Sequence, residues 1–335
     1  MRKHKPQTNP LSLNDTGNHI RPSSNETSDQ LRQLYPHKPK ANETVAVAVS
    51  GGVDSMVTTL LLKEDQHEVL ALHMILRPED SPEPGEHVVQ LAVRLSVPLH
   101  VVDLRRPFHQ QVIKPFLEAY RRGQTPNPCV ICNPNIKFTL LQEQAVELGA
   151  TTLATGHYVR LLRDESDGSL RLFRGRDRSK DQSYFLYRLD QAQLARTFFP
   201  LGNYLKSEVR KVAEDAGMQG YYRPESQEIC FISDKDYRTF LEQHLGSDLP
   251  GPGPVVDLNG RQLGEHEGIH RYTIGQRRGL GIPSSAPYYV IGLEPDTNTI
   301  RVGRESDLRR REMLVTDVNW IGASPPTSEL QALVQ

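Results

Sequence analysis

The sequence predicts an α/β protein, in which a parallel sheet with helices on both faces is followed by a small mixed domain and a β-rich C-terminal region. The first observation is a continuous run of β-branched and small apolar residues at Val45–Val49, typical of a strand buried on both faces. The second is an alternation of strand-like and helix-like segments up to residue 155, which favours parallel pairing. The third is a change after residue 250 to short strands separated by Gly-rich turns.

Length and composition limit the class of protein. The 335 residues are enough for two or three domains. Apolar residues make up 37% and charged residues 24%, and no run approaches the roughly 18 apolar residues of a membrane span, so we expect no membrane partner. The net charge is −1, so any surface for nucleic acid must be local. Three cysteines argue against a disulfide scaffold and favour a reducing compartment, for which we predict the cytoplasm.

Residues 1–41 are predicted to form a disordered N-terminal arm. Few of them are apolar and five are prolines, so the segment buries too little apolar surface to offset its ordering entropy. It lacks the apolar stretch of a signal peptide. Arg2, Lys3 and Lys5 hint at an organelle transit peptide, but the prolines interrupt the amphipathic helix that such a peptide needs.

Residues 42–157 form the predicted α/β domain. The first strand is followed by an apolar helical segment at Met56–Lys63. The other elements follow in this order: strand Val69–Met74, helix His87–Leu95, strand His100–Asp103, helix Phe108–Arg122, helix Lys137–Leu148 closed by Gly149, and strand Thr151–Thr155.

Two further regions follow, at residues 158–250 and 251–335. In the first we expect a hairpin around Asp167-Gly168 and three short helices, at Asp190–Arg196, Lys206–Ala216 and Lys235–Leu245. The Pro- and Gly-rich segment Leu249–Pro254 predicts a break. In the second region we expect strands at Val255–Asp257, Tyr288–Leu293, Ile300–Val302 and Leu314–Val318.

The segment Ser50–Ser55, with the sequence SGGVDS, lies directly between the buried strand and a helix. This context suits phosphate binding, because glycines let the ligand approach the backbone and a helix N-terminus attracts an anion. Asp54 cannot usefully face a bare phosphate, so it is expected to hold Mg²⁺ beside it. A tight turn with an Asp or Ser N-cap is the alternative interpretation.

The cysteines are Cys129 and Cys132, which form one C-x-x-C, and the distant Cys230. A Cys₄ zinc site would need a second pair, but zinc bound with Cys230 and a histidine stays open. Nearby prolines predict a loop around the C-x-x-C, and so exposed, reactive thiols. Two cysteines from distant positions that meet at one site would suffice for a persulfide route.

The hexapeptide resembles the PP-loop of the ATP pyrophosphatases, which adenylate a carbonyl oxygen and release pyrophosphate. Further motifs are shared with one branch of that superfamily: Gly123–Asn133 followed by Ile136–Phe138, Ala154–Tyr158, Lys180–Leu186, Ser226–Ile232 and Gly268–Gly281. Together they closely resemble the tRNA-specific 2-thiouridylases, the MnmA/TrmU family, from Val45 to Trp320. The resemblance implies a Rossmann-like PP-loop domain and a partial C-terminal β-barrel, since the family continues into a complete barrel after the Trp320 region and this chain stops at Gln335.

The resemblance also implies roles for individual residues. Cys230 corresponds to the persulfide carrier, and Cys132 to the nucleophile that forms a disulfide with it as sulfur leaves. Asn127, Pro128 and Cys129 correspond to the stretch around the target base. Some family members carry Asp at the Cys129 position, so the role of a thiol there is in question.

The positions implied for ATP are Ala48, Val49, Ser50, Gly51, Gly52, Val53, Asp54, Ser55, Met74 and Gly156. Met74 taken alone is an ordinary core residue. The positions implied for tRNA are His157, Lys180, Asp181 and Gln182. Acidic residues interleave with the basic run from Arg160 to Lys180, so a solvated charged face is an alternative to phosphate contact, and Arg277-Arg278 has the same ambiguity.

The expected function is ATP-dependent 2-thiolation of the wobble uridine of tRNA. ATP and Mg²⁺ are the expected cofactors, and a sulfur-relay protein or cysteine desulfurase is the expected persulfide donor. Two alternatives remain: another PP-loop amidating or ligating enzyme, which would not need Cys132 and Cys230, and a tRNA-binding protein without catalysis.

Overall fold

The computed structural model describes residues 38–40, 42–77, 80–223, 229–232, 236–322 and 325–332. Residues 1–37 and 41 of the predicted N-terminal arm lie outside the described residues. Among the described residues, no helix combines the length and the apolar character that crossing a bilayer requires.

The predicted parallel sheet is present and has five strands in the order β3-β2-β1-β4-β7. Its strands are β1 (Thr44–Ala48), β2 (Glu68–Ile75), β3 (Leu99–Asp103), β4 (Thr152–Ala154) and β7 (Thr197–Phe198). The central position of β1 explains its apolar sequence, because Val45, Ala46 and Val47 are fully buried. The carboxyl ends of β1 and β4 lead into the two loops that form the candidate phosphate site described below.

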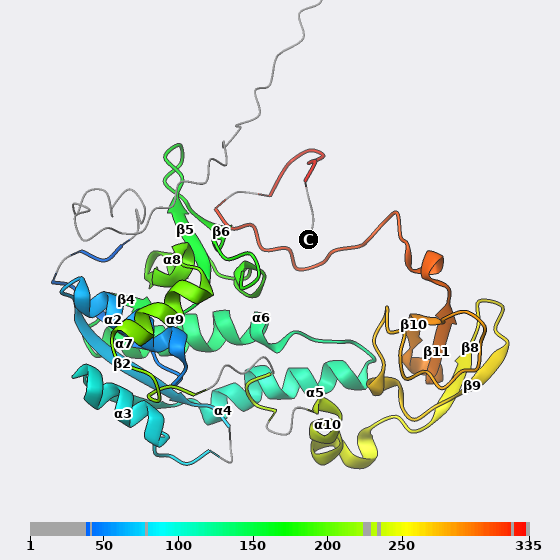
Figure 1. Ribbon diagram of the computed structural model, residues 1–335. Helices are drawn as coiled ribbons and strands as arrows, with labels where there is room; N and C mark the ends of the chain where they lie inside the picture. The colour runs from blue at the N-terminus through cyan, green and yellow to red at the C-terminus, as the bar shows by residue number, and fades with distance from the viewer. Residues whose placement is uncertain are drawn as a thin grey trace, which may run out of the picture. The chain divides into compact units, whose positions relative to one another are not determined.

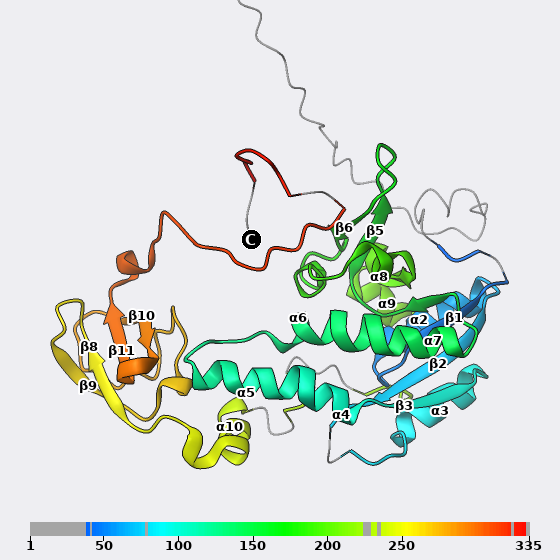
Figure 2. The same cartoon turned by 180° about the vertical axis from the view of Figure 1, so that it is seen from behind.

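Helices α2 (Val53–Glu64) and α3 (Glu86–Leu95) follow β1 and β2. Right-handed crossovers place these two on one face of the sheet, and the connection from β3 back to β4 on the other. That connection consists of two long helices that run side by side (Figures 1 and 2). Each contains a π-helical stretch: α4 (Arg105–Phe108), η1 (His109–Ile113) and α5 (Lys114–Arg121), then α6 (Pro128–Cys132), η2 (Asn133–Leu141) and α7 (Gln142–Glu147).

The segment after residue 157 packs against the first sheet. The predicted hairpin forms from β5 (Val159–Arg163) and β6 (Leu170–Arg174), and β7 then pairs with β4. The helices of this segment are η3 (Ser183–Phe185), α8 (Gln191–Ala195), η4 (Pro200–Asn203), α9 (Lys206–Asp215), α10 (Tyr237–Leu245) and η5 (Gly246–Asp248). Helix α9 contacts α2, which brings the start of α9 to the edge of the candidate phosphate loop.

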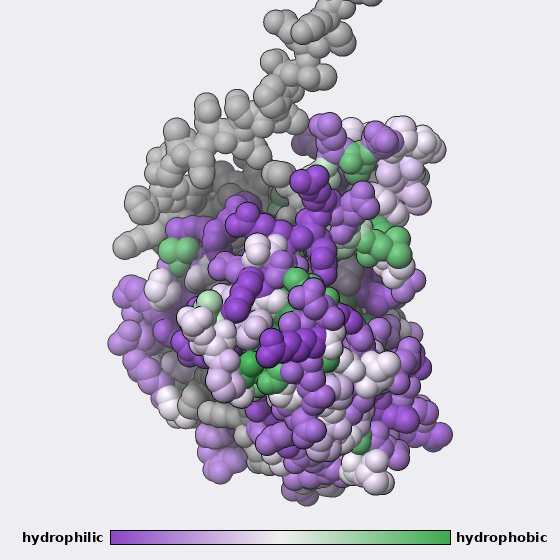
Figure 3. Space-filling view, turned by 90° about the vertical axis from the view of Figure 1, so that its right-hand side faces the viewer, coloured by the Kyte–Doolittle hydropathy of each residue, from purple (hydrophilic) through white to green (hydrophobic). Residues whose placement is uncertain are grey.

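A second, four-stranded sheet has the order β10-β11-β8-β9 around a small apolar core. It contains β8 (Gly253–Val256), β9 (Gln262–His266), β10 (Tyr289–Glu294) and β11 (Thr299–Gly303), with short helices η6 (Ile269–Arg271), η7 (Pro295–Thr297) and η8 (Glu305–Leu308). The face of the molecule drawn in Figure 3 is dominated by hydrophilic residues, with small apolar areas between them.

The strand predicted at Leu314–Val318 was wrong. The segment pairs with none of the described strands, and Leu314 is 91% exposed. Its β-branched and apolar residues suit a strand, but no neighbouring strand supplies the backbone hydrogen bonds that would make it one.

Candidate active site

The segment Ser50–Ser55, which we call the phosphate loop, forms a tight loop between β1 and α2. Gly51 has φ +78°, a left-handed conformation that favours glycine. The Ser55 hydroxyl donates to the Gly52 carbonyl at 3.0 Å and accepts the Ser50 N–H at 3.3 Å. The loop is therefore closed by one of its own side chains.

The N-terminus of α2 is open to an anion. Its N-cap is Gly52, with no side-chain cap, so the alternative of an Asp or Ser N-cap is wrong. Gly156, at the end of β4, approaches this terminus closely: a Cβ at position 156 would lie 2.9 Å from Asp54 Cβ and 3.1 Å from the backbone nitrogen of Ser55. A larger residue at position 156 would push into the loop, so glycine is what lets the two backbone segments approach this closely.

Asp54 is held by two side chains from distant parts of the chain. Lys206 Nζ lies 2.7 Å from both carboxylate oxygens, and the Tyr158 hydroxyl donates to one of them at 2.8 Å. Lys206 is the first residue of α9, and its side chain is 7% exposed. The carboxylate is therefore neutralised by a lysine.

The expected position of Mg²⁺ on Asp54 does not fit this arrangement. A cation bound directly by the carboxylate would have to displace Lys206 from both oxygens. Among the described residues, no three or more His, Cys, Asp or Glu side chains are grouped to hold a metal ion, and this includes the three cysteines. The described side chains do not form a metal cage of their own.

The segment that leads to Cys230 is attached to the loop. The Arg223 N–H donates to the Gly51 carbonyl at 2.8 Å, and Arg223 makes a parallel bridge with Gly52. The phosphate loop and the start of the cysteine segment are therefore in backbone contact.

The other positions implied for ATP lie at the carboxyl end of the sheet. The Val49 N–H donates to the Leu72 carbonyl at 2.8 Å, and His73 Nδ1 lies 2.9 Å from the Val49 carbonyl oxygen. Met74 is partly buried and packs against the main core. Its core role is confirmed, and its place near adenine stays a prediction.

The C-x-x-C lies on a helix, so the predicted loop was wrong. Pro128 is the first residue of α6, where a missing N–H costs nothing, and the Asn127 side chain caps the helix by accepting the Cys129 N–H at 3.2 Å. The hydrogen bonding changes to π-helical next to Pro134, whose missing N–H would interrupt an α-helix. Asn127 thus has a structural role, whatever it contacts in a complex.

Cys132 is not exposed, contrary to the expectation of reactive surface thiols. Only 6% of the residue is accessible, and burial raises the pKa of its thiol to about 12. Lys137 opposes this rise, while Cys230 and Cys129 add to it, so the three sulfur atoms and one ammonium group interact. Lys137 follows Cys132 by five residues, a spacing that places both on the same side of a π-helix.

Cys230 lies at a turn anchored by aromatic rings. The Ile232 N–H donates to the Ile229 carbonyl, which closes the turn. The adjacent Phe231 is buried and makes edge-on contacts with Phe108 and Phe116, at 5.7 and 5.2 Å between centroids. Cys230 itself is exposed, yet neighbouring protein atoms desolvate its thiol and raise its pKa, with Lys137 opposing.

His157 is held next to this cluster as a neutral ring. Desolvation, and to a lesser extent Lys137, keep the pKa of His157 well below its usual value. Its Nδ1 lies 2.6 Å from the Thr155 hydroxyl, and its ring packs between Phe138 and Phe199. A neutral imidazole offers hydrogen bonds and stacking to RNA, but no charge for a phosphate.

Two of the implied tRNA-binding residues hold their own loop. Asp181 accepts the Gly175 N–H at 3.0 Å and the Ser183 hydroxyl at 2.9 Å. Gln182 Oε1 accepts the Tyr158 N–H at 3.0 Å. Lys180 is half-buried. The geometry gives Asp181 and Gln182 structural roles, and contact with tRNA stays a prediction for all three.

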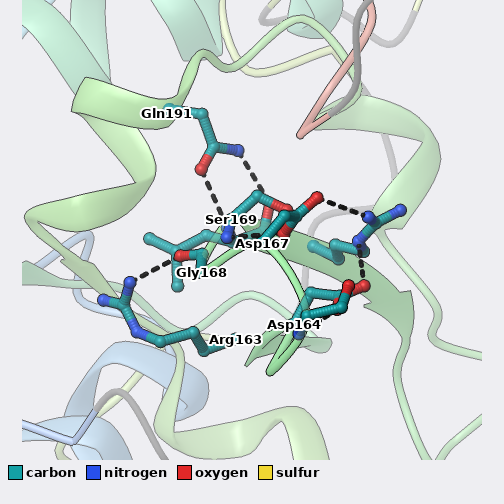
Figure 4. Close-up of polar contacts among 9 residues, drawn as sticks. Arg163, Asp164, Asp167, Gly168, Ser169 and Gln191 are labelled. Carbon is teal, nitrogen blue, oxygen red and sulfur yellow. Dashed lines mark hydrogen bonds and ion pairs between the residues drawn. The ribbon is translucent and has the colours of Figure 1, made fainter.

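Part of the basic run is already paired within the hairpin (Figure 4). Arg171 contacts Asp164 at 2.8 Å and Asp167 at 3.0 Å, and Arg163 donates to the Gly168 carbonyl. The hairpin is fastened to α8 by Gln191, which makes two hydrogen bonds with the backbone of Leu170. For Arg163 and Arg171 the interpretation as a self-paired charged face is therefore the better one.

Three residues of the site, Lys206, Tyr158 and Lys137, have no role predicted from the sequence. Lys206 carries no local signal, because it meets Asp54 across 152 positions of the chain. Tyr158 and Lys137 belong to the shared motifs, but only the fold shows which groups they meet. The five-residue spacing of Lys137 from Cys132 becomes informative only once the helix is known to be π-helical.

Comparisons with known proteins match most of the chain. The sequence profile described as "tRNA methyl transferase HUP domain" matches residues 43–234, and that of "tRNA methyl transferase PRC-barrel domain" matches residues 238–304. Curated relatives carry the name "tRNA-specific 2-thiouridylase MnmA". The protein of Heliobacterium modesticaldum is 44% identical over 83% of this chain and 75% of its own length. That of Geobacter metallireducens is 45% identical over 84% and 80%, and that of Trichlorobacter lovleyi 46% identical over 85% and 80%.

The profiles and the relatives agree with the motifs quoted above. The first profile alone spans more than half of the chain and contains both the phosphate loop and the three cysteines. The chain therefore belongs to the MnmA family of tRNA-specific 2-thiouridylases.

Proposed function

We propose that this protein is an ATP-dependent tRNA sulfurtransferase that converts the wobble uridine of tRNA to 2-thiouridine. The single observation that carries the proposal is the coexistence, in one compact unit, of an open phosphate loop and a cluster of three thiols. The MnmA name of the relatives supports the choice of tRNA as the substrate. A ligase or amidating enzyme with the same loop would have no use for the thiols.

In the first step, the 2-carbonyl oxygen of the uridine attacks the α-phosphorus of ATP, and pyrophosphate leaves. The proposed ATP site is the loop Ala48–Ser55 with Met74 and Gly156. Its contribution is positioning and charge, since the glycines and the uncapped start of α2 present N–H groups to the phosphates. We infer that Mg²⁺ arrives with the triphosphate, because Asp54 is already paired.

In the second step, the terminal sulfur of a persulfide on Cys230 attacks C2 of the adenylated base, and AMP leaves. The base is then joined to Cys230 through an S–S bond. The Cys132 thiolate attacks the Cys230 sulfur, the bond to the base breaks, and its electrons leave with the 2-thiouridine. A Cys132–Cys230 disulfide remains, and an external thiol must reduce it before the next turnover.

The location of the cysteines supports these roles. Cys230 is exposed, which suits access by a donor protein, whereas Cys132 is buried. We propose a sulfur-relay protein or a cysteine desulfurase as the donor, and the cytoplasm as the compartment, where a disulfide formed in each cycle can be reduced. For tRNA we propose contacts at Asn127, Pro128, Cys129, His157, Lys180, Asp181 and Gln182.

The test is mass spectrometry of tRNA nucleosides from cells with and without the gene. We expect 2-thiouridine derivatives at the wobble position to disappear when the gene is deleted and to return with the wild-type chain. Purified protein should release pyrophosphate from ATP only when tRNA is present. Pyrophosphate release without tRNA, together with unchanged nucleosides, would identify a different adenylating enzyme, and tRNA binding without release would identify a non-catalytic protein.

A further inference from the structure

The pairing of Lys206 with Asp54 places a buried cation at the edge of the phosphate loop. Lys206 begins α9, and its backbone N–H is held by the Asp177 carboxylate at 2.9 Å. The start of this helix is fastened a second time, because Glu208 accepts the Leu205 N–H at 2.8 Å and pairs with Arg176 at 3.0 Å. The lysine therefore projects from a fixed point.

The environment of Nζ is also fixed. It is bound by both Asp54 oxygens and lies 5.6 Å from the centre of the Tyr158 ring. The Tyr158 hydroxyl holds the same carboxylate at 2.8 Å. A buried ammonium in such a setting is expensive to desolvate, so its retention at this place calls for a use beyond simple stability.

We propose that Lys206 is a phosphate-binding residue of the ATP site, and that Asp54 positions this lysine instead of ligating Mg²⁺. The inference rests on the proposed function, because it assumes that the loop binds ATP. Asp54 is the second residue of α2, so a group 2.7 Å from its carboxylate lies beside the uncapped helix start where the phosphates would bind. Arginine or lysine side chains that complement a helix N-terminus are a common way to hold phosphate.

The alternative is a purely structural pair, in which Lys206 does no more than neutralise Asp54. Removing the charges of Lys206 and Asp54, one and then both, distinguishes the phosphate-binding role from the structural pair. In both, Lys206→Met leaves the Asp54 carboxylate unpaired near the triphosphate, and ATP affinity falls. Only in the structural case does a second change, Asp54→Asn, restore the affinity.

The experiment is equilibrium dialysis of labelled ATP against the full-length chain without tRNA. We expect Lys206→Met to weaken ATP binding about tenfold or more, and the double variant Asp54→Asn/Lys206→Met to stay weak by a similar factor. Lys211→Met is the matched control, because Lys211 lies on the same helix, is exposed and pairs only at 3.3 Å with Asp215. This control should bind ATP as the wild type does.

A return of the double variant to wild-type affinity would overturn the proposal and leave a structural pair. Thermal unfolding of each variant shows whether it is folded. If Lys206→Met does not fold, the double variant, which removes the Asp54 charge together with the ammonium group, carries the test alone.

A separate measurement tests whether Asp54 ligates Mg²⁺. The Mg²⁺ concentration that gives half-maximal ATP binding should differ less than about threefold between wild type and Asp54→Asn, whereas loss of a direct ligand would raise it about tenfold or more. Such a rise would overturn this part. If the wild-type chain binds no ATP, the proposed function fails; if it binds ATP and Lys206→Met binds equally well, only the inference fails.

Discussion

The phosphate loop and the thiol cluster of this protein are built in opposite ways. The loop is local: six consecutive residues, a left-handed glycine and a helix start present N–H groups that are ready for a ligand. The cluster is assembled from two segments about a hundred positions apart, and its central thiol, Cys132, is buried and protonated. The comparison teaches that the groups of the loop are set by local sequence, whereas Cys132, in the role proposed for it, needs a change in its surroundings before its thiolate can form.

The largest effects should come from the cysteines themselves. Cys132→Ser and Cys230→Ser should each abolish 2-thiouridine formation with a purified sulfur donor, because one thiol carries the sulfur and the other takes its place. Cys129→Ser should keep a measurable fraction, since neither step requires a third thiol. If Cys129→Ser is as inactive as the other two, the C-x-x-C works as a unit and the assignment of roles is wrong.

A change in the loop should stop the reaction at an earlier point. Asp54→Ala should remove tRNA-dependent pyrophosphate release, because Lys206 loses the carboxylate that holds its ammonium group. Cys230→Ser should still release pyrophosphate on the first turnover. The measurement is pyrophosphate release by both variants, with circular dichroism as the control for folding. Equal loss in both would mean that the two halves of the reaction are not separable.

The pH dependence of thiol reactivity sharpens the comparison. With the pKa of Cys132 raised to about 12, its thiolate fraction grows with pH, and its alkylation by iodoacetamide should rise about a hundredfold from pH 8 to pH 10. Lys137→Met should slow this alkylation, since the ammonium group opposes the raised pKa, and Lys114→Met on the exposed side of α5 should not. Mass spectrometry of the labelled peptide measures the rate, and a plateau near pH 9 would contradict the burial.

The stability of the folded protein should also depend on the ionisation of Cys132. Because the folded-state pKa of Cys132 lies above the ordinary value of 9.0, the unfolded chain loses the proton first. Stability is therefore full below about pH 9 and falls as pH rises toward 12. Thermal unfolding between pH 8.5 and 10 should show this fall in the wild type and a smaller one in Cys132→Ala. An equal fall in both would assign the alkaline loss to other groups.

The sequence predicted the local part of the site well and the assembled part only through a family resemblance. The parallel sheet and the phosphate loop follow from runs of apolar residues and glycines, whose effects act over a few positions. The prolines around the C-x-x-C were misleading, because Pro128 suits the first position of a helix and the π-helical stretch accommodates Pro134. The contact between Asp54 and Lys206 had no local signal, and neither did the burial of Cys132.

The smallest expected effect concerns the salt dependence of tRNA affinity. It distinguishes an arginine that is paired within the β5–β6 hairpin from an exposed arginine that follows the hairpin. Binding should weaken as salt rises, because each phosphate that the protein neutralises releases counterions, and the slope of log K against log salt changes by about 0.7 to 0.9 per contact. Arg171 is already paired with Asp164 and Asp167, so Arg171→Gln should leave the slope nearly unchanged. Arg178 is exposed. Burial, and to a lesser extent the charge of Arg178, lower the pKa of Arg160, so the two positive charges lie close enough to repel each other. Arg178→Gln should therefore reduce the slope by the amount that corresponds to about one phosphate contact.

Titrations of tRNA binding at several salt concentrations measure both slopes. Equal slopes for the two variants would mean that the hairpin region is a self-paired surface, and that the tRNA phosphates are held elsewhere.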